Sequence, residues 1–167
     1  MTIRKLSFKR IRGFLALACL ASLALQCLWA QTQPASSVAV IVNQDTPVSD
    51  LSLEDVRKIF LGERQYWNAK LPVVLLIRAP VARERDIVLR VIYQMNEVQF
   101  KRYWIAKIFR AESANAPKIV YSNTMANELA SAIPGAIAFM DAHDVKPGVK
   151  VIRIDGKLPS DPDYPLK

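Results

Sequence analysis

Cysteine and histidine are scarce in this sequence of 167 residues, and their scarcity excludes several kinds of site. The two cysteines, Cys19 and Cys27, fall within the first 30 residues, and His143 is the single histidine. A disulfide framework and a cysteine-based zinc site are therefore excluded for the rest of the chain. The sequence also has no Gly-x-Ser-x-Gly, no His-Glu-x-x-His and no glycine-rich phosphate loop. We therefore expect no catalytic residues, no cofactor and no enzyme activity.

Glycine is sparse, with five residues, and the ten prolines are scattered along the chain rather than clustered. This composition excludes collagen and low-complexity sequence, and no internal repeat is visible. Hydrophobic residues make up 51% of the chain and charged residues 23%, as in one ordinary globular domain.

The N-terminus has the pattern of an export signal. Residues 1–13 carry five basic side chains and no acid, and an apolar run follows from Phe14 to Leu28. The small residue Ala30 precedes a polar stretch, so we predict a signal peptide over residues 1–30 and a disordered linker over residues 31–37. The alternative is an uncleaved anchor, but an apolar run of about 15 residues falls short of the roughly 20 that span a bilayer.

Export places the mature chain in the periplasm or outside the cell, with no membrane span after cleavage. Lipidation of Cys19 or Cys27 is disfavoured, because Ala16 and Ala24 stand where a lipidation sequence prefers leucine. Removal of residues 1–30 takes five basic residues and no acidic ones, so the formal charge of +8 falls to +3. The basic bias therefore belongs to the export signal, and we expect no nucleic-acid partner.

From residue 38 onward, apolar runs alternate with helical patterns. Val38–Val42 is a solid β-branched run, which is typical of a strand buried on both faces. The patterns predict strands at 38–42, 71–77, 118–121, 136–140 and 149–154. They predict helices at 53–61 with an N-cap at Ser52, from Arg83 through Met95, at 97–109 with a cap formed by Asn96 and Gln99, and after a cap at Ser122 or Asn123. Alternating strands and helices predict a mixed, mostly parallel sheet with helices on both faces.

The helix at 97–109 is rich in large apolar residues. Its helical spacing predicts one core-facing side formed by Phe100, Tyr103, Trp104, Ile108 and Phe109. Trp67 lies between a helix and a strand, where we expect it to cap the core.

Three arginines form the candidate binding site. Arg78 ends the second strand, and Arg83 and Arg85 follow in the first turn of the next helix. In open α/β sheets ligands bind at the carboxyl ends of strands, where helix N-termini favour anions. Glu84 and Asp86 interleave with these arginines, so a solvated helix face is the alternative.

A metal site is not predicted from the segment around His143. Asp141, His143 and Asp144 are nearly consecutive, whereas a ligand set needs convergent geometry. We interpret this segment as a solvated loop that follows a strand.

Two segments resemble the periplasmic phosphate-binding proteins of ABC transporters. One is Leu51–Gly62, which ends in Ile-Phe-Leu-Gly before Trp67, and the other is Ile133–Phe139, which contains Pro-Gly-Ala-Ile. The resemblance implies that residues 38–167 form one lobe of a type II periplasmic-binding-protein-like fold. It further implies a solute-binding protein of phosphate transport, with Arg78 as a ligand residue and a membrane permease or sensor as partner.

The sequence departs from this family at the ligand loop. Where the family has Arg-x-Asp-Gly-Ser-Gly-Thr, this chain has Pro80 for Asp, Ala82 for Ser and Glu84 for Thr. Family members close two lobes around the ligand, and this chain matches one. Two hypotheses follow: weak binding of phosphate or another oxyanion through Arg78 with Arg83 and Arg85, or a single-lobe interaction or regulatory module that has lost the ligand site.

Overall fold

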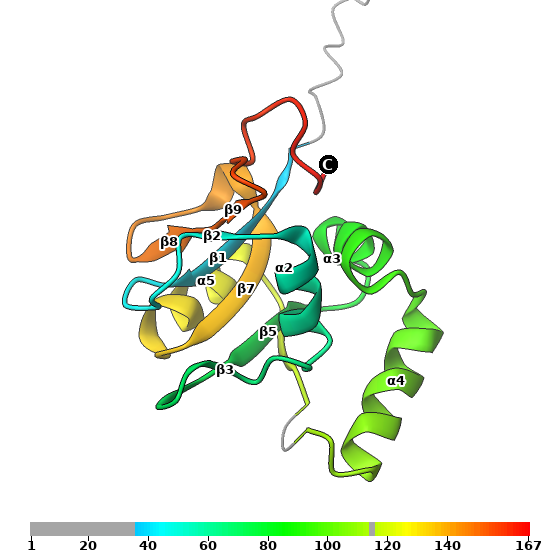
Figure 1. Cartoon of the computed structure of the whole chain (residues 1–167). Helices are drawn as coiled ribbons and strands as arrows, with labels where there is room; N and C mark the ends of the chain where they lie inside the picture. Colours follow the sequence, from blue (N-terminus) through cyan, green and yellow to red (C-terminus); the bar gives the residue numbers. More distant parts are fainter. Residues whose placement is uncertain (1–35, 114–115) are drawn as a thin grey trace, which may run out of the picture. The chain divides into compact units, whose positions relative to one another are not determined.

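A five-stranded mixed sheet forms the centre of the computed structural model, which describes residues 36–113 and 116–167 (Figure 1). The predicted signal peptide lies outside the described residues. The strand order is β6-β5-β7-β1-β8, with β1 Val38–Asn43, β5 Val74–Arg78, β6 Lys118–Val120, β7 Ala136–Asp141 and β8 Val149–Val151. Strand β1 runs antiparallel to both of its neighbours, whereas β5 is parallel to β6 and β7. The predicted mixed, mostly parallel sheet is confirmed.

Smaller elements complete the domain. The short strands are β2 (Asp50–Leu51), which pairs with β9 (Arg153–Ile154), and β3 (Tyr66–Asn68), which pairs with β4 (Leu71–Pro72). The helices are α2 (Leu53–Phe60), α3 (Arg83–Val88), the π-helical turn η2 (Leu89–Tyr93), α4 (Glu97–Phe109), α5 (Asn123–Ala132) and the 3₁₀ turn η3 (Ala142–Asp144).

Polar side chains define the helix starts, as predicted. Ser52 caps α2 by accepting a hydrogen bond from the Asp55 N–H at 3.0 Å. Asn96 and Gln99 form a reciprocal capping box at the start of α4. At α5 the cap is Ser122 rather than Asn123, which leaves the Asn123 side chain free for another role.

Both faces of the sheet are covered by helices (Figure 1). The side chains buried on the two faces differ. One face packs large residues, such as Ile77 and Phe139, against α2, α3, η2 and α4. The other packs several alanines, such as Ala39 and Ala138, together with Leu76 and Met140, on the side of α5. Every residue of β1 is buried, so the prediction of a strand covered on both faces is confirmed.

Two predicted strands are interrupted. The predicted 71–77 strand breaks at Val73, whose N–H bonds to the Gln65 carbonyl, so β4 pairs with β3 while β5 joins the main sheet. The predicted 149–154 strand breaks at Ile152, after which β9 leaves the sheet and pairs with β2. The predicted helix through Met95 becomes a π-turn at Leu89 and ends at Gln94, which is left-handed with φ 53°.

The prediction for α4 was wrong at its C-terminal end. Phe100 and Trp104 are buried and Tyr103 is partly buried, but Ile108 is 43% exposed and Phe109 is 92% exposed. Phe109 is five residues beyond Trp104, which turns it well away from the buried side of a helix with 3.6 residues per turn. Helix α4 therefore has apolar residues on two sides, and the domain covers one of them.

The C-terminal segment, residues 157–167, closes the domain through turns rather than as extended chain, with turn hydrogen bonds from the Asp161 N–H to the Leu158 carbonyl and from the Tyr164 N–H to the Asp161 carbonyl. The Val38 N–H donates to the Leu166 carbonyl at 2.8 Å, and the Tyr164 hydroxyl donates to the Val38 carbonyl at 3.0 Å. Burial raises the pKa of Tyr164 well above its ordinary value. Within the described ranges, no helix is long and apolar enough to cross a membrane.

Trp67 caps the core, as expected, and it does so against the turn before β7. Its indole N–H donates to the Gly135 carbonyl at 2.8 Å. Gly135 has φ +75°, and a Cβ at this position would lie 2.1 Å from the Pro72 carbonyl oxygen. Glycine is therefore required at this turn by both the backbone conformation and the close approach of a second chain segment.

We predict that Gly135→Ala strongly destabilises the domain, because the new methyl group would collide with a backbone carbonyl. Gly148→Ala is the matched control, since Gly148 also has a positive φ but its Cβ would meet nothing closer than 3.4 Å. The control should cost about 1–3 kcal/mol of backbone strain, and Gly135→Ala clearly more. Urea unfolding measures the unfolding free energy of both variants. Equal losses of free energy in the two would contradict the close approach of the Pro72 carbonyl to Gly135.

Candidate functional site

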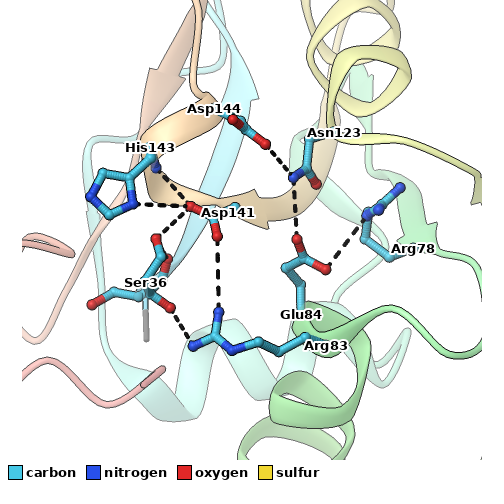
Figure 2. Close-up of polar contacts among 9 residues, drawn as sticks. Ser36, Arg78, Arg83, Glu84, Asn123, Asp141, His143 and Asp144 are labelled. Atoms are coloured by element: carbon cyan, nitrogen blue, oxygen red, sulfur yellow. Dashed lines mark hydrogen bonds and ion pairs between the residues drawn. The ribbon is translucent and has the colours of Figure 1, made fainter. Parts of the chain in front are cut away.

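Polar side chains meet at the edge of the sheet where β5 and β7 end. The first turns of α3 and α5 and the residue pair before β1 reach the same place (Figure 2). We call this group the edge cluster; it consists of Ser36, Arg78, Arg83, Glu84, Asn123, Asp141, His143 and Asp144. Open α/β sheets bind ligands at this edge, so the location fits the sequence prediction.

Arg78 faces a carboxylate of its own chain. Its Nε lies 3.9 Å from Oε2 of Glu84, and each of the two side chains is 10% exposed. One terminal nitrogen of Arg78 donates to the Val120 carbonyl at 3.4 Å, while Nε has no hydrogen-bond partner. Figure 2 shows the Glu84 carboxylate between Arg78 and Asn123. The buried guanidinium charge is therefore balanced from within the domain.

Asn123 ties this pair to the neighbouring loop. Its side-chain amide donates to Oε1 of Glu84 at 3.2 Å and to Oδ2 of Asp144 at 2.7 Å. Asn123 can do so because Ser122 supplies the cap of α5. From the sequence we considered Asn123 only as a cap, although its position three residues after the end of β6 marks it as an edge residue.

Arg83 lies at the outer side of the edge cluster. One of its terminal nitrogens is 3.9 Å from Oδ2 of Asp141, and the other donates to the Ser36 carbonyl. Burial alone would raise the pKa of Asp141, but hydrogen bonds from the Ser36 hydroxyl and the His143 backbone N–H outweigh it and lower the pKa below its ordinary value of 3.8. Asp141 is therefore held as a carboxylate.

Arg85 points away from the edge cluster. Its guanidinium makes a two-pronged contact with Glu97, at 2.9 and 3.0 Å, and donates to the Arg78 carbonyl at 2.6 Å. It also lies 4.7 Å from the centre of the Phe100 ring. Residues two apart on a helix do not share a side, so Arg83 and Arg85 diverge. The structure brings Arg78 and Arg83 to the edge, whereas Arg85 joins β5 and α3 to α4.

Negative charge outweighs positive charge within the edge cluster. Arg78 and Arg83 are its two guanidinium groups, and Glu84, Asp141 and Asp144 are its three carboxylates. A free anion that approached this edge would meet net repulsion from these five groups. Among the residues that the structure describes, no group of three or more His, Cys, Asp and Glu side chains could hold a metal ion.

A cavity of about 210 Å³ lies away from the edge cluster. It is formed by the loop at 62–66, the start of β5, Trp104 and Lys118. Because its walls include the start of β5 and not the strand's carboxyl end, it belongs to the opposite end of the sheet. None of the predicted arginines lines it.

Comparison of the structure with solved structures shows a shared fold. A phosphate ABC transporter substrate-binding protein from Clostridium perfringens, solved with bound phosphate, matches with a TM-score of 0.60 and 19% identity, covering 74% of this chain and 47% of that one. An ABC-type phosphate transport receptor from Vibrio cholerae matches with a TM-score of 0.60 and 20% identity, covering 75% and 48%. PstS from Borrelia burgdorferi matches with a TM-score of 0.59 and 14% identity, and the match covers 75% of this chain and 49% of that one.

These matches confirm the predicted fold class, a mixed α/β lobe of the periplasmic-binding-protein type. The chain spans less than half the length of each of these structures. No family model matches the sequence, and no curated protein matches it. The structural neighbours are transport binding proteins rather than enzymes.

We predict that Arg85→Ala costs about 3–5 kcal/mol of unfolding free energy, because it leaves the Glu97 carboxylate and the Arg78 carbonyl without their buried partner. Arg83→Ala is the control, since its side chain is 41% exposed and its ion pair is long. The control should cost less than about 1 kcal/mol. Denaturant unfolding measures the unfolding free energy of each variant. A loss of less than about 1 kcal/mol in Arg85→Ala would contradict the role of Arg85 in joining β5 and α3 to α4.

Proposed function

We propose that this chain is an exported lobe of the phosphate-transporter binding-protein type that acts through a protein partner. The proposal rests on one observation, the buried contact between the Arg78 guanidinium and the Glu84 carboxylate. The arginine that the family resemblance assigns to phosphate has a carboxylate of the same chain beside it. The domain thus keeps the architecture of a binding lobe while its own side chain takes the place of the anion.

The internal carboxylate has a physical advantage over a free ligand. Glu84 is held by the first turn of α3 and by Asn123, so it meets Arg78 without the loss of translational freedom that binding costs a free anion. An incoming phosphate would also have to displace Glu84 and approach Asp141 and Asp144. Water and salt compete further with any anion at an edge that only one lobe covers.

Apolar side chains beside the edge cluster support a protein partner. Val81 follows β5 and is 99% exposed, and Tyr121 follows β6 and is 74% exposed. The two strand ends are adjacent, since the Ala79 N–H donates to the Val120 carbonyl at 2.8 Å. Val81 has φ +67°, a strained conformation for a β-branched residue, and such strain is concentrated at functional sites.

The proposed location and partner class are supported by the sequence and the neighbours together. The N-terminal pattern supports export to the periplasm, and the neighbours act in ABC transport of phosphate. A membrane permease or membrane sensor is therefore the class of partner that we propose. The exported chain would present its open edge and exposed apolar side chains to that protein.

A second function, weak binding of inorganic phosphate or another oxyanion, is favoured by one observation. The Nε of Arg78 is buried without a hydrogen-bond partner, so the guanidinium retains donor capacity. Arg83 could assist from the outer side of the edge cluster, whereas Arg85 would act only by positioning Arg78 through its backbone carbonyl.

We predict that phosphate does not change the thermal unfolding midpoint of the wild-type protein at low salt. Glu84→Gln should lower the midpoint, because it leaves the buried Arg78 charge unpaired. Phosphate should then raise the midpoint of this variant, since an anion that binds only the folded state stabilises it. Differential scanning fluorimetry with phosphate and chloride at equal ionic strength measures the response.

The double variant Arg78→Met, Glu84→Gln is the matched control and should show no phosphate response. A phosphate-specific increase in the wild-type protein that disappears in Arg78→Met would contradict the proposal and establish the second function instead.

A further inference from the structure

Helix α4 carries an exposed apolar stripe on the side that faces away from the domain. Val98, Ile105 and Phe109 are 57%, 65% and 92% exposed. With Arg102 they stand at intervals of four, three and four residues, so the four side chains form one line along the helix. We call Val98, Arg102, Ile105 and Phe109 the outer seam. Figure 1 shows α4 at the margin of the domain.

The domain does not need the outer seam in order to fold. Helix α4 is held by its opposite side, where Phe100 and Trp104 are buried, and the Tyr103 hydroxyl donates to the Leu61 carbonyl at 2.7 Å. Arg85 and the capping box hold its N-terminal end. A helix that is apolar on both sides is normally buried on both sides. The outer seam is therefore explained by a contact with another molecule.

The spacing of the outer seam specifies the shape of that molecule. Intervals of four and three are those of the a and d positions in paired helices, with Val98 and Ile105 at d and Arg102 and Phe109 at a. Ile108 and Lys101 flank the line on one side, at positions that commonly contact a partner helix. A narrow line of this kind fits another helix better than it fits a broad lipid surface.

The charge on the outer seam specifies the chemistry of the partner. Arg102 has no ion pair and no hydrogen bond with any residue that the structure describes. Lys101 lies beside it, 3.7 Å from Glu97, whose carboxylate is already engaged by Arg85. The outer seam itself has no acidic residue. A second copy of this helix would set arginine against basic residues, whereas an acidic helix would pair with them.

We propose that the outer seam of α4 docks an amphipathic helix of a partner protein that carries apolar residues at heptad spacing and a carboxylate opposite Arg102. This inference rests on the proposed function, in which the lobe acts through a protein partner, and it adds the surface and the partner's chemistry. Most of the affinity would come from Ile105 and Phe109, and the choice of partner from Arg102.

Two fluorescently labelled heptad peptides test the proposal. Both have leucine at the a and d positions; one carries glutamate opposite Arg102 and at the flanking positions, and the other carries lysine there. Fluorescence anisotropy should show that the purified wild-type protein binds the acidic peptide at least about tenfold more tightly than the basic one. Arg102→Glu should reverse this preference, and Phe109→Ser should weaken acidic-peptide binding by about tenfold or more.

The control variants separate the outer seam from other exposed apolar side chains and from folding. Tyr66→Ser removes an exposed apolar side chain on β3, outside both the outer seam and the edge cluster, and should leave peptide binding unchanged. Because the substituted side chains are exposed, the unfolding midpoints should stay near that of the wild type. The reversal in Arg102→Glu also shows that this variant is folded, since a misfolded protein would bind neither peptide.

Several results would overturn the proposal. One is that neither peptide binds, and another is that the acidic peptide binds the Arg102→Glu variant as tightly as the wild type. The others are dimerisation of the protein, or its attachment to phosphatidylglycerol vesicles, that Phe109→Ser abolishes. The last two would assign the outer seam to a second copy or to a membrane. Failure of the proposed function would be seen in a different measurement, because phosphate would then raise the unfolding midpoint of the wild-type protein. That response does not depend on α4.

Discussion

Strand β1 is the element on which the rest of the domain depends. It is hydrogen-bonded to β7 on one edge and to β8 on the other, and all of its residues are buried. The C-terminal segment fastens to its first residue through Leu166 and Tyr164. Because β1 pairs in register with β7 from Val38 to Val42, it brings Ser36 beside Asp141 at the end of β7. The edge cluster is thus built on a rigid base.

The edge cluster illustrates how one buried charge determines the chemistry around it. Arg78 ends a buried strand, so its guanidinium requires a counter-charge or a hydrogen-bonding ligand nearby. In this chain Glu84 supplies the counter-charge, and Asn123 fixes the orientation of Glu84. Arg85 meanwhile holds the Arg78 carbonyl and extends the arrangement to α4. Arg85 therefore links the strand that carries Arg78 to the helix that carries the outer seam.

Much of the fold could be predicted because it depends on local patterns. A helix start depends on residues within one turn, so the caps at Ser52 and Asn96 were found from the sequence alone. The breaks at Val73 and Ile152 depend on pairing with segments far along the chain, which no local pattern encodes. The error at Phe109 has a similar origin, since periodicity reveals that a side is apolar but not whether anything covers it.

The candidate site could be predicted only in outline. Arg78 was identified from the rule that ligands bind at the carboxyl ends of strands, and Glu84 was recognised as a departure from the family pattern. The divergence of Arg83 and Arg85 follows from helix geometry, which places residues two apart on different sides. The roles of Asn123 and Asp141 depend on which strands become neighbours in the sheet, and that requires the tertiary structure.

A crystal structure of the wild-type protein grown in phosphate would decide whether the Glu84 carboxylate takes the place of an anion beside Arg78, as we claim. We expect electron density for Glu84 between Arg78 and Asn123, with no phosphate contacting the Arg78 guanidinium. A phosphate ion bound to Arg78, with Glu84 turned out toward solvent, would contradict the claim.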